Sequence, residues 1–519
     1  MRLTLSFRES VCLILAVVSP PCMATGTADV AAQYHCAGSA QLAGNTNLVT
    51  LNKGFALRSA PAVWKLAMTR ISGLLANSFH LGTNASTASL IEPLLSDVVE
   101  SESFASFGGS STNFLGFVLA LRLDEKRAQL WQDNLGKAFG RPGEKLTMEE
   151  FNGWRWRMGA SDSFWIIPAR DWLLVGRGDD LLPVQVEYLR QVSRNGQPSP
   201  ALTDNWLEAD LDCPRLAAWL PDWLRLAQLA RIKIRMATET NNLHMTARVI
   251  YPETIPWKSG SWQPPVEFVS GPLVSFTVGQ NIAAFLNLDP VFFRLDGNPF
   301  TNQFYAWGMS GLPFLTYMAW PVPNATNVME ELSTNAPAVF NPGLKQFNGT
   351  QLAWQTRWRR LVLMNLRVIL PYLEAAQGNA GEYLLAALLP PPHMKEPVPH
   401  DLWKPVNGRT NLVYYDWERT GTRLQQWRML GRMLLTRSRA LTDEMLGAQI
   451  HEERWLGALA PLVGDGETVT EITRVAPDEL AVVRNSPIGF TGIELYLLSE
   501  WLSTIGAAPT NSQPPAFKP

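Results

Sequence analysis

A segment rich in proline, glycine and serine lies near the middle of the chain and reads YPETIPWKSGSWQPP, residues 251–265. Such residues interrupt regular secondary structure, so the segment is typical of a linker. It divides the 519 residues almost evenly, and a chain of this length favours two domains. We therefore expect a first domain over residues 25–250, a linker over 251–266 and a second domain over 267–505.

Both halves mix the hydrophobic periods of strands and helices. Short segments alternate apolar and polar residues, and longer segments repeat apolar residues at the helical period. The expected strands include 153–158, 163–167, 243–250, 273–278, 351–354, 383–389 and 469–475. The expected helices include 60–76, 88–99, 125–139, 181–192, 419–435 and 493–505. This mixture predicts the α+β class, with mostly antiparallel sheets and helices on one face.

One pair of segments suggests that the two halves are similar copies. Residues 117–139 read FVLALRLDEKRAQLWQDNLGKAF, and residues 411–434 read NLVYYDWERTGTRLQQWRMLGRML. Each begins as a strand, continues through an acidic turn and ends as a helix centred on Trp131 or Trp427. We expect these two tryptophans to be buried at equivalent positions.

A second pair of segments supports the same prediction. Arg177 and Arg484 each end an expected strand, and Glu187 and Glu494 follow them at the same spacing on an expected helix. Because both matches occur in the same order, the sequence predicts an internal duplication, in which these arginines and glutamates are equivalent. We expect a partly buried ion pair between the arginine and the glutamate of each half.

The first 24 residues have the three parts of a secretory signal peptide. Arg2 and Arg8 give a basic start, residues 11–18 are apolar, and small residues precede a cleavage site after Ala24. The apolar stretch is too short to cross a bilayer, and no later segment predicts a transmembrane helix. We expect a periplasmic or extracellular protein, with residues 506–519 as a disordered tail.

Charge and short motifs exclude several classes of function. Lys and Arg number 44 against 46 Asp and Glu, which gives a net charge of -2, so a nucleic-acid partner is not expected. The sequence His451-Glu452-Glu453 lacks the second histidine of a zinc-binding helix. We therefore expect no metal site and no cofactor.

Two cysteines, Cys36 and Cys213, remain after the signal peptide. Two cysteines cannot form a disulfide framework, so the hydrophobic core must stabilise the fold. An oxidising compartment permits a bond between them, and we expect both to be buried and regard the pair as a candidate disulfide.

Asp416 and Glu418 are the strongest candidates for chemistry. On a strand they project from the same face as Tyr414, with Cα atoms roughly 6–7 Å apart, near the spacing of the carboxylate pairs that hydrolyse glycosides. The simpler interpretation is that acidic residues between a strand and a helix satisfy free backbone amides. We favour this second interpretation.

A basic and aromatic patch lies at residues 354–360. The residues that could bind a partner there are Trp354, Arg357, Trp358, Arg359 and Arg360. Such a patch can bind anionic lipid, nucleic acid or polysaccharide, but more often it is a solvated surface whose tryptophans pack inward.

The phrases NLVYYDWE and SPIGFTGIELYLLSEWL, together with the order of elements, resemble an uncharacterised group of secreted bacterial proteins built from two similar α+β halves. The resemblance implies secretion and duplication, and it implies no activity. We expect an exported, non-catalytic binding or structural protein of the cell envelope or exterior, whose partner is an envelope protein, an apolar ligand or a glycan. The alternative is a secreted hydrolase that acts on glycans through Asp416 and Glu418.

Overall fold

The structure is a computed structural model. It describes residues 30–78, 85–109, 116–159, 162–199, 205–216, 230–257, 260–281, 302–312, 315–345, 349–366, 369–390, 396, 398–399, 401–435 and 443–503. The expected signal peptide and C-terminal tail lie outside these residues.

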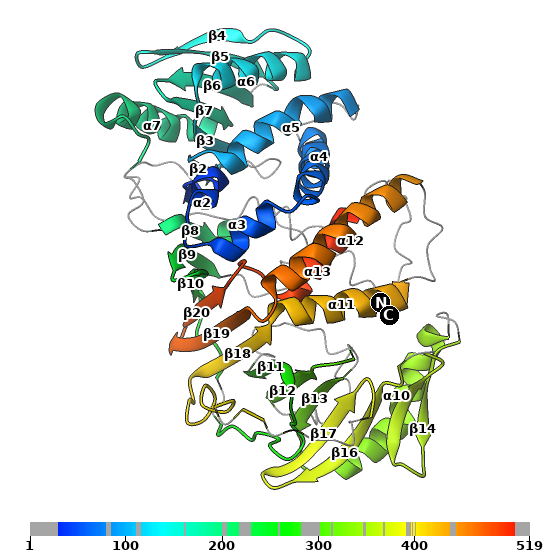
Figure 1. The fold of residues 1–519 in the computed structure, drawn as a ribbon. Helices are drawn as coiled ribbons and strands as arrows, with labels where there is room; N and C mark the ends of the chain where they lie inside the picture. Colours follow the sequence, from blue (N-terminus) through cyan, green and yellow to red (C-terminus); the bar gives the residue numbers. More distant parts are fainter. Residues whose placement is uncertain are drawn as a thin grey trace.

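One antiparallel sheet of 20 strands runs through the described part of the molecule (Figure 1). The strands of the first half are β1 (Val30–Cys36), β2 (Ser103–Gly108), β3 (Gly116–Arg122), β4 (Glu144–Met148), β5 (Phe151–Arg157), β6 (Ser163–Ala169), β7 (Trp172–Arg177), β8 (Asn205–Asp212), β9 (Arg231–Glu239) and β10 (Asn242–Ile250). Those of the second half are β11 (Leu273–Gln280), β12 (Gln303–Met309), β13 (Thr316–Pro321), β14 (Gln351–Gln355), β15 (Arg360–Met364), β16 (Tyr372–Gly378), β17 (Gly381–Ala387), β18 (Leu412–Arg419), β19 (Glu467–Ala476) and β20 (Glu479–Ser486).

The two sets of strands pair in the same order. The first set is ordered β4-β5-β6-β7-β3-β2-β1-β8-β9-β10. The second is ordered β14-β15-β16-β17-β13-β12-β11-β18-β19-β20. The sets meet where β10 pairs with β20.

Four irregularities of register also fall at matching places, whereas a fifth, between Arg474 and Ala476 of β19, has no counterpart in the β9–β10 ladder. The pairing shifts at the second residue of β1 and of β11, which are Ala31 and Val274. It shifts again at the second residue of β8 and of β18, which are Trp206 and Val413. Because a bulge fixes which residues face each side of the sheet, these positions define a residue-by-residue correspondence between the two sets.

Helices cover the sheet. They are α2 (Ser39–Ala43), α3 (Val49–Phe55), α4 (Ala60–Ser78), α5 (Ala85–Glu100), α6 (Glu125–Ala138), α7 (Leu182–Asn195), α8 (Cys213–Leu216), α10 (Ala325–Leu344), α11 (Thr420–Leu435), α12 (Asp443–Val463) and α13 (Gly492–Ser503), with a 3-10 turn at Asp179–Leu181. Asp124 caps α6 by accepting a hydrogen bond from the Arg127 amide at 2.8 Å, as expected for an acidic residue before a helix.

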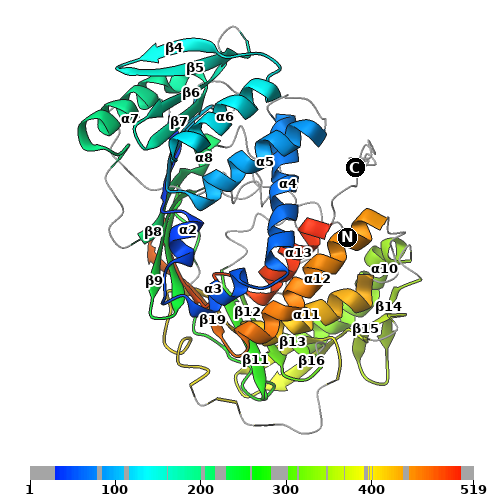
Figure 2. The ribbon, with the colours of Figure 1, turned by 45° about the horizontal axis from the view of Figure 1, so that its top comes forward.

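The helices of the two halves pack together. Helix α4 lies beside α12 and α13 (Figure 2). Val63 and Met68 of α4 share a hydrophobic cluster with Trp501 and Leu502 of α13. The halves are therefore joined by a helical layer as well as by the β10–β20 ladder.

The expected linker contains neither a helix nor a strand in its described part, but it is firmly attached. Ile255 is buried against Val413 and Leu480. The Trp262 ring nitrogen donates a hydrogen bond to the Arg409 carbonyl at 3.0 Å. Apolar side chains in this segment thus contribute to the core.

The α+β class is confirmed, and the expected strands and helices differ from the observed ones by a few residues at their ends. The equivalence of Arg177 and Arg484 is wrong, because β7 lies between β3 and β6 whereas β20 lies between β10 and β19. Arg177 pairs with Asp162 at 2.9 Å, not with Glu187. Strand, turn and helix signals recur so often in an α+β chain that short matches misalign.

The match between residues 117–139 and 411–434 is wrong for the same reason, since β3 occupies the place of β13 and not of β18. Trp131 is buried on α6 and donates a hydrogen bond to Asp97 at 2.8 Å. Trp427 is only half-buried.

Cys36 and Cys213 are both free thiols, and Cys36 is only partly buried. The antiparallel pairing of β1 with β8 places Cys36 opposite Leu207, which precedes Cys213 by six residues. Six strand residues span roughly 20 Å, whereas a disulfide needs Cα atoms within about 7 Å. The fold therefore does not support the candidate disulfide.

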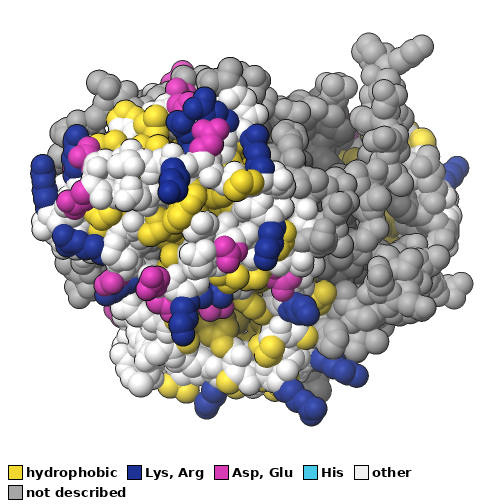
Figure 3. All heavy atoms as spheres, turned by 90° about the horizontal axis from the view of Figure 1, so that it is seen from above, with side chains coloured by type: hydrophobic (Ala, Val, Ile, Leu, Met, Phe, Trp, Pro, Cys, Tyr) yellow, Lys and Arg dark blue, Asp and Glu magenta, His cyan; other side chains and the backbone are white. Residues whose placement is uncertain are grey.

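The surface carries both signs of charge. Seen from the β4 end of the molecule, Lys and Arg side chains are interspersed with Asp and Glu (Figure 3). In the described ranges, no helix combines the length and the apolar character needed to span a membrane.

Candidate functional site

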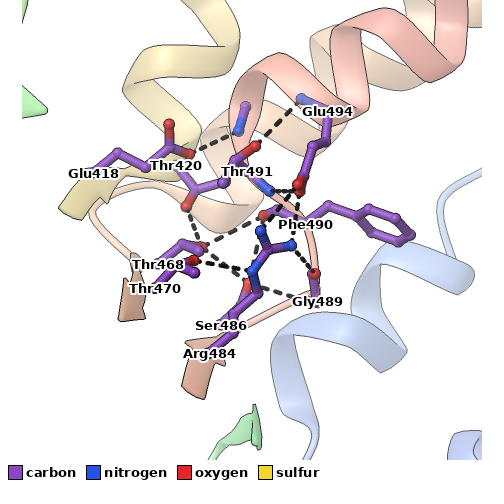
Figure 4. Close-up of polar contacts among 11 residues, drawn as sticks. Glu418, Thr420, Thr468, Thr470, Arg484, Ser486, Gly489, Phe490, Thr491 and Glu494 are labelled. Atoms are coloured by element: carbon purple, nitrogen blue, oxygen red, sulfur yellow. Dashed lines mark hydrogen bonds and ion pairs between the residues drawn. The ribbon is translucent and has the colours of Figure 1, made fainter. Parts of the chain in front are cut away.

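A polar cavity of about 240 Å³ lies between the sheet and the first turns of α11 and α13 (Figure 4). Strands β11, β18, β19 and β20 provide its sheet side. Its lining residues are Ser275, Thr277, Tyr414, Asp416, Glu418, Arg423, Trp427, Thr470, Arg484, Thr491, Ile493 and Glu494.

The strand period places the carboxylates in this cavity. Tyr414, Asp416 and Glu418 alternate along β18 and so project from one face. Asp416 lies opposite Thr277 on β11 and opposite Thr470 on β19. The expectation that the two carboxylates share a face is confirmed.

Asp416 is held by a single described hydrogen bond, which the Thr277 hydroxyl donates to Oδ1 at 2.6 Å. Burial raises the pKa of the Asp416 carboxyl, and this hydrogen bond partly opposes the shift. Arg484 and Arg423 also lower this pKa, although within the described residues neither forms an ion pair with Asp416.

Glu418 is more deeply placed, with 5% of its surface exposed. Its Oε1 accepts a hydrogen bond from the Gly492 amide at 2.7 Å, at the first residue of α13. Burial raises the pKa of Glu418 to about 7, although this hydrogen bond lowers it. The interpretation that such an acidic residue satisfies a helix amide thus holds for Glu418, but the helix is α13 and not the following α11.

Arg484 and Glu494 form the compensated part of the site. Two guanidinium nitrogens of Arg484 donate to the two oxygens of Glu494 at 3.0 Å each. Glu494 also accepts from the Thr491 amide at 2.8 Å, while the Thr491 hydroxyl accepts from the Glu494 amide at 3.3 Å. This reciprocal pattern is a capping box, and Figure 4 shows Arg484 reaching from β20 to it.

A chain of hydroxyl groups lies beside the carboxylates. Thr468 contacts the hydroxyls of Thr420 at 2.7 Å and of Ser486 at 2.9 Å. Ser486 in turn accepts a hydrogen bond from the Gly489 amide at 3.0 Å. These bonds fix the ends of β19 and β20 against the start of α11.

Arg423 enters from α11 and is 7% exposed. It donates to Gln426 at 2.7 Å, and its guanidinium lies 4.9 Å from the centre of the Trp427 ring. Burial lowers the pKa of Arg423, while Glu418 and Asp416 raise it. The guanidinium of Arg423 fits here because the adjacent residue is Gly308; a Cβ atom on residue 308 would lie only 2.7 Å from Nη1 of Arg423.

Two hydroxyl groups in the cavity are unsatisfied. Neither Ser275, at 7% exposure, nor Tyr414 has a hydrogen-bond partner among the residues that the structure describes. Both residues line the cavity, so their hydroxyl oxygens are available to a ligand as acceptors.

The corresponding face of the first half is apolar. The bulges align Ala32 with Ser275, Ala209 with Asp416, Leu211 with Glu418, Ile232 with Thr468, Ile234 with Thr470 and Ala247 with Arg484. Tyr34, which corresponds to Thr277, is the exception. Helices α8 and α11 both begin directly after their strands, which aligns Leu216 with Arg423. Ala32, Leu211 and Leu216 pack in one hydrophobic cluster.

The basic and aromatic patch forms a separate site, on the hairpin of β14 and β15 at one end of the sheet. Trp358 is 59% exposed. The guanidinium groups of Arg357 and Arg360 lie 5.2 and 5.5 Å from its ring centre. Arg359 pairs with Glu330 at 2.5 Å, and Trp354 is half-buried against α10. Trp354 thus packs inward, as expected for this patch, whereas Trp358 does not.

Most of the cavity could not be predicted from the sequence. Ser275 and Thr277 lie on β11, far from β18 in sequence, and Arg423 of α11 belongs to no motif. The capping box was visible in the sequence, since Thr491 precedes Glu494 by three residues. Only the pairing of β11 with β18 brings these groups together.

No group of three or more His, Cys, Asp or Glu side chains suited to a metal ion occurs in the described residues. Comparisons with protein-family models, curated proteins and solved structures found no match to this chain.

Proposed function

We propose that this chain is an exported binding protein whose second half holds a small polar ligand in the cavity beneath α11 and α13. The observation that carries the proposal is the chemistry of the sheet face. Charged and hydroxyl side chains line this face in the second half. Apart from Tyr34, the corresponding positions of the first half carry Ala, Leu and Ile. The fold does not need polar groups there, so we assign them to binding.

The size of the cavity limits the ligand. Pockets for drug-sized molecules measure roughly 300–1,000 Å³, and this one measures about 240 Å³. A small molecule fits better than a polymer. The lining is polar, which favours a polar ligand over the apolar ligand expected from the sequence.

Native mass spectrometry of the mature chain, purified after export from a bacterial host, tests both parts of the proposal. We expect loss of Met1–Ala24 and a bound small molecule. Thr470→Ile, which introduces the residue of the corresponding position Ile234, should abolish binding. The control is Thr473→Ile on the same strand, whose side chain points to the other face. Retention of the ligand by Thr470→Ile would place it elsewhere.

We also propose that the two sets of strands arose by internal duplication, as in the secreted bacterial proteins that the sequence resembles. The equal strand order and the four bulges at matching positions support this. An experimental structure offers the test: superposing β1–β10 on β11–β20 should bring Ala31 onto Val274 and Trp206 onto Val413. Misplacement of either pair would reject the duplication.

A glycan hydrolase that uses Asp416 and Glu418 is the second candidate. It is favoured by one observation, which is that burial raises the pKa of Glu418 to about 7, a value suited to a general acid. The small cavity and the 5% exposure of Glu418 argue against access for a sugar chain. Release of reducing sugars by the wild type but not by Glu418→Gln would favour this candidate over simple binding.

A further inference from the structure

We infer that the ligand carries a protonated amino group, which is bound by Asp416 and its neighbours on the sheet. This inference rests on the proposed binding function and specifies its ligand.

The charges of the cavity indicate a cation. Arg484 and Glu494 compensate each other through two hydrogen bonds. The cavity holds two other carboxyl groups, those of Asp416 and Glu418, and one other guanidinium, that of Arg423. None of these three forms an ion pair within the described part of the chain. With both carboxyls ionised, the set carries one negative charge more than Arg423 offsets. A bound cation balances this charge, as does the proton that the buried Glu418 otherwise retains.

The free acceptors match an ammonium group. Thr277 donates to Oδ1 of Asp416, and no other described group donates a hydrogen bond to this side chain. The hydroxyl oxygens of Ser275 and Tyr414 are also without partners among the described residues. An ammonium group donates three hydrogen bonds and accepts none, so a cavity lined with acceptor oxygens suits it.

The other walls fit the carbon part of such a ligand. The Trp427 ring and Ile493 line the same cavity, and both offer apolar contact. A cavity of about 240 Å³ accommodates an organic amine of a few carbon atoms. A bare metal ion would leave most of this volume unfilled. Only two carboxyl groups without an ion partner, those of Asp416 and Glu418, could coordinate it.

Saturation-transfer NMR, which detects weak ligands, tests the inference with a matched pair of probes. The mature chain is mixed with propylamine or with propanol, which has the same size and no charge. We expect propylamine to bind at least about tenfold more strongly, because hydrogen bonds to charged groups contribute about 1.5–3 kcal/mol. Asp416→Asn should weaken propylamine binding by a similar factor. Asp465→Asn, at an 84% exposed side chain, is the control and should leave it unchanged.

The outcomes separate the inference from the proposed function. Equal binding of both probes, or full binding of propylamine by a folded Asp416→Asn variant, would overturn the inference while leaving a polar binding site. Glucose, a neutral polar probe, should bind no more strongly than propanol; strong glucose binding would also overturn the inference. Absence of binding by every probe, together with no co-purified ligand in native mass spectrometry, would overturn the proposed function as well.

Discussion

The face formed by β1, β8 and β9 and the face formed by β11, β18 and β19 share a strand order but differ in chemistry. In the first, Ala32, Leu211 and Leu216 form an apolar cluster. In the second, the corresponding positions carry Ser275, Glu418 and Arg423, at similarly low exposure. One strand arrangement therefore accepts both an ordinary core and a polar cavity.

The difference teaches that the polar groups are not a requirement of the fold. Burying charges costs free energy unless they are paired. Apolar side chains at the same places stabilise the first half at no such cost. The polar face thus costs stability that the apolar face does not, as expected if its residues serve the proposed binding.

The strongest test introduces the acidic residue of the second half into the first. Leu211 is fully buried, and Leu211→Glu would place a carboxyl among the apolar side chains of its cluster. We expect a loss of roughly 3–5 kcal/mol in the free energy of unfolding, measured by urea denaturation. Leu211→Met, which nearly conserves volume, should cost less than about 1.5 kcal/mol. Equal effects of the two variants would show that the first half also tolerates charge.

The pH dependence of stability measures the cost of the charge in the second half. Burial raises the pKa of Glu418 to about 7; Asp416 adds to the shift, and Arg423 opposes it. The folded chain therefore holds this proton more tightly than the unfolded chain. The resulting stabilisation is complete below the unfolded pKa of about 4.3 and is lost as the pH rises through 7, by about 3 kcal/mol in all.

Glu418→Gln removes this proton equilibrium. The free energy of unfolding of the wild type, compared with that of Glu418→Gln between pH 4.5 and 8, should fall relative to the variant by about 3 kcal/mol. Parallel profiles would mean that Glu418 titrates normally and that its surroundings are wetter than the structure indicates.

Converting the polar face to the chemistry of the first half gives a smaller effect of opposite sign. The triple variant Asp416→Ala, Glu418→Leu, Arg423→Leu copies Ala209, Leu211 and Leu216. Replacing buried charges together by apolar residues is often neutral or stabilising by about 1–4 kcal/mol. We expect a melting temperature at or above that of the wild type and no binding of propylamine. Arg423→Leu alone should instead lower stability, because it leaves the two carboxyls without their nearby guanidinium.

The sequence predicted part of this comparison. The two-residue period of β18 was enough to place Asp416 and Glu418 on one face, and the helical period located α11 and α13. The ion pair between Arg484 and Glu494 was also predicted, from their spacing. The neighbour Ser275 could not be predicted, because strand pairing joins residues far apart in the chain. The correspondence between halves was also hidden, since equivalent residues such as Leu211 and Glu418 share no chemistry. Arg177 and Arg484 were matched instead because the short segments around them are similar in sequence.

The smallest test exchanges a single hydroxyl group between corresponding positions. Ser275 has no hydrogen-bond partner among the described residues, and Ala32 lies in an apolar cluster. Ser275→Ala should therefore change the free energy of unfolding by less than about 0.5 kcal/mol, whereas Ala32→Ser should cost about 1–3 kcal/mol by burying an unsatisfied hydroxyl. Binding should respond in the reverse order: Ser275→Ala weakens propylamine in saturation-transfer NMR, and Ala32→Ser leaves it unchanged. If Ser275→Ala costs as much stability as Ala32→Ser, the Ser275 hydroxyl stabilises the fold. Ser275 would then no longer support the contrast between an apolar core and a binding face.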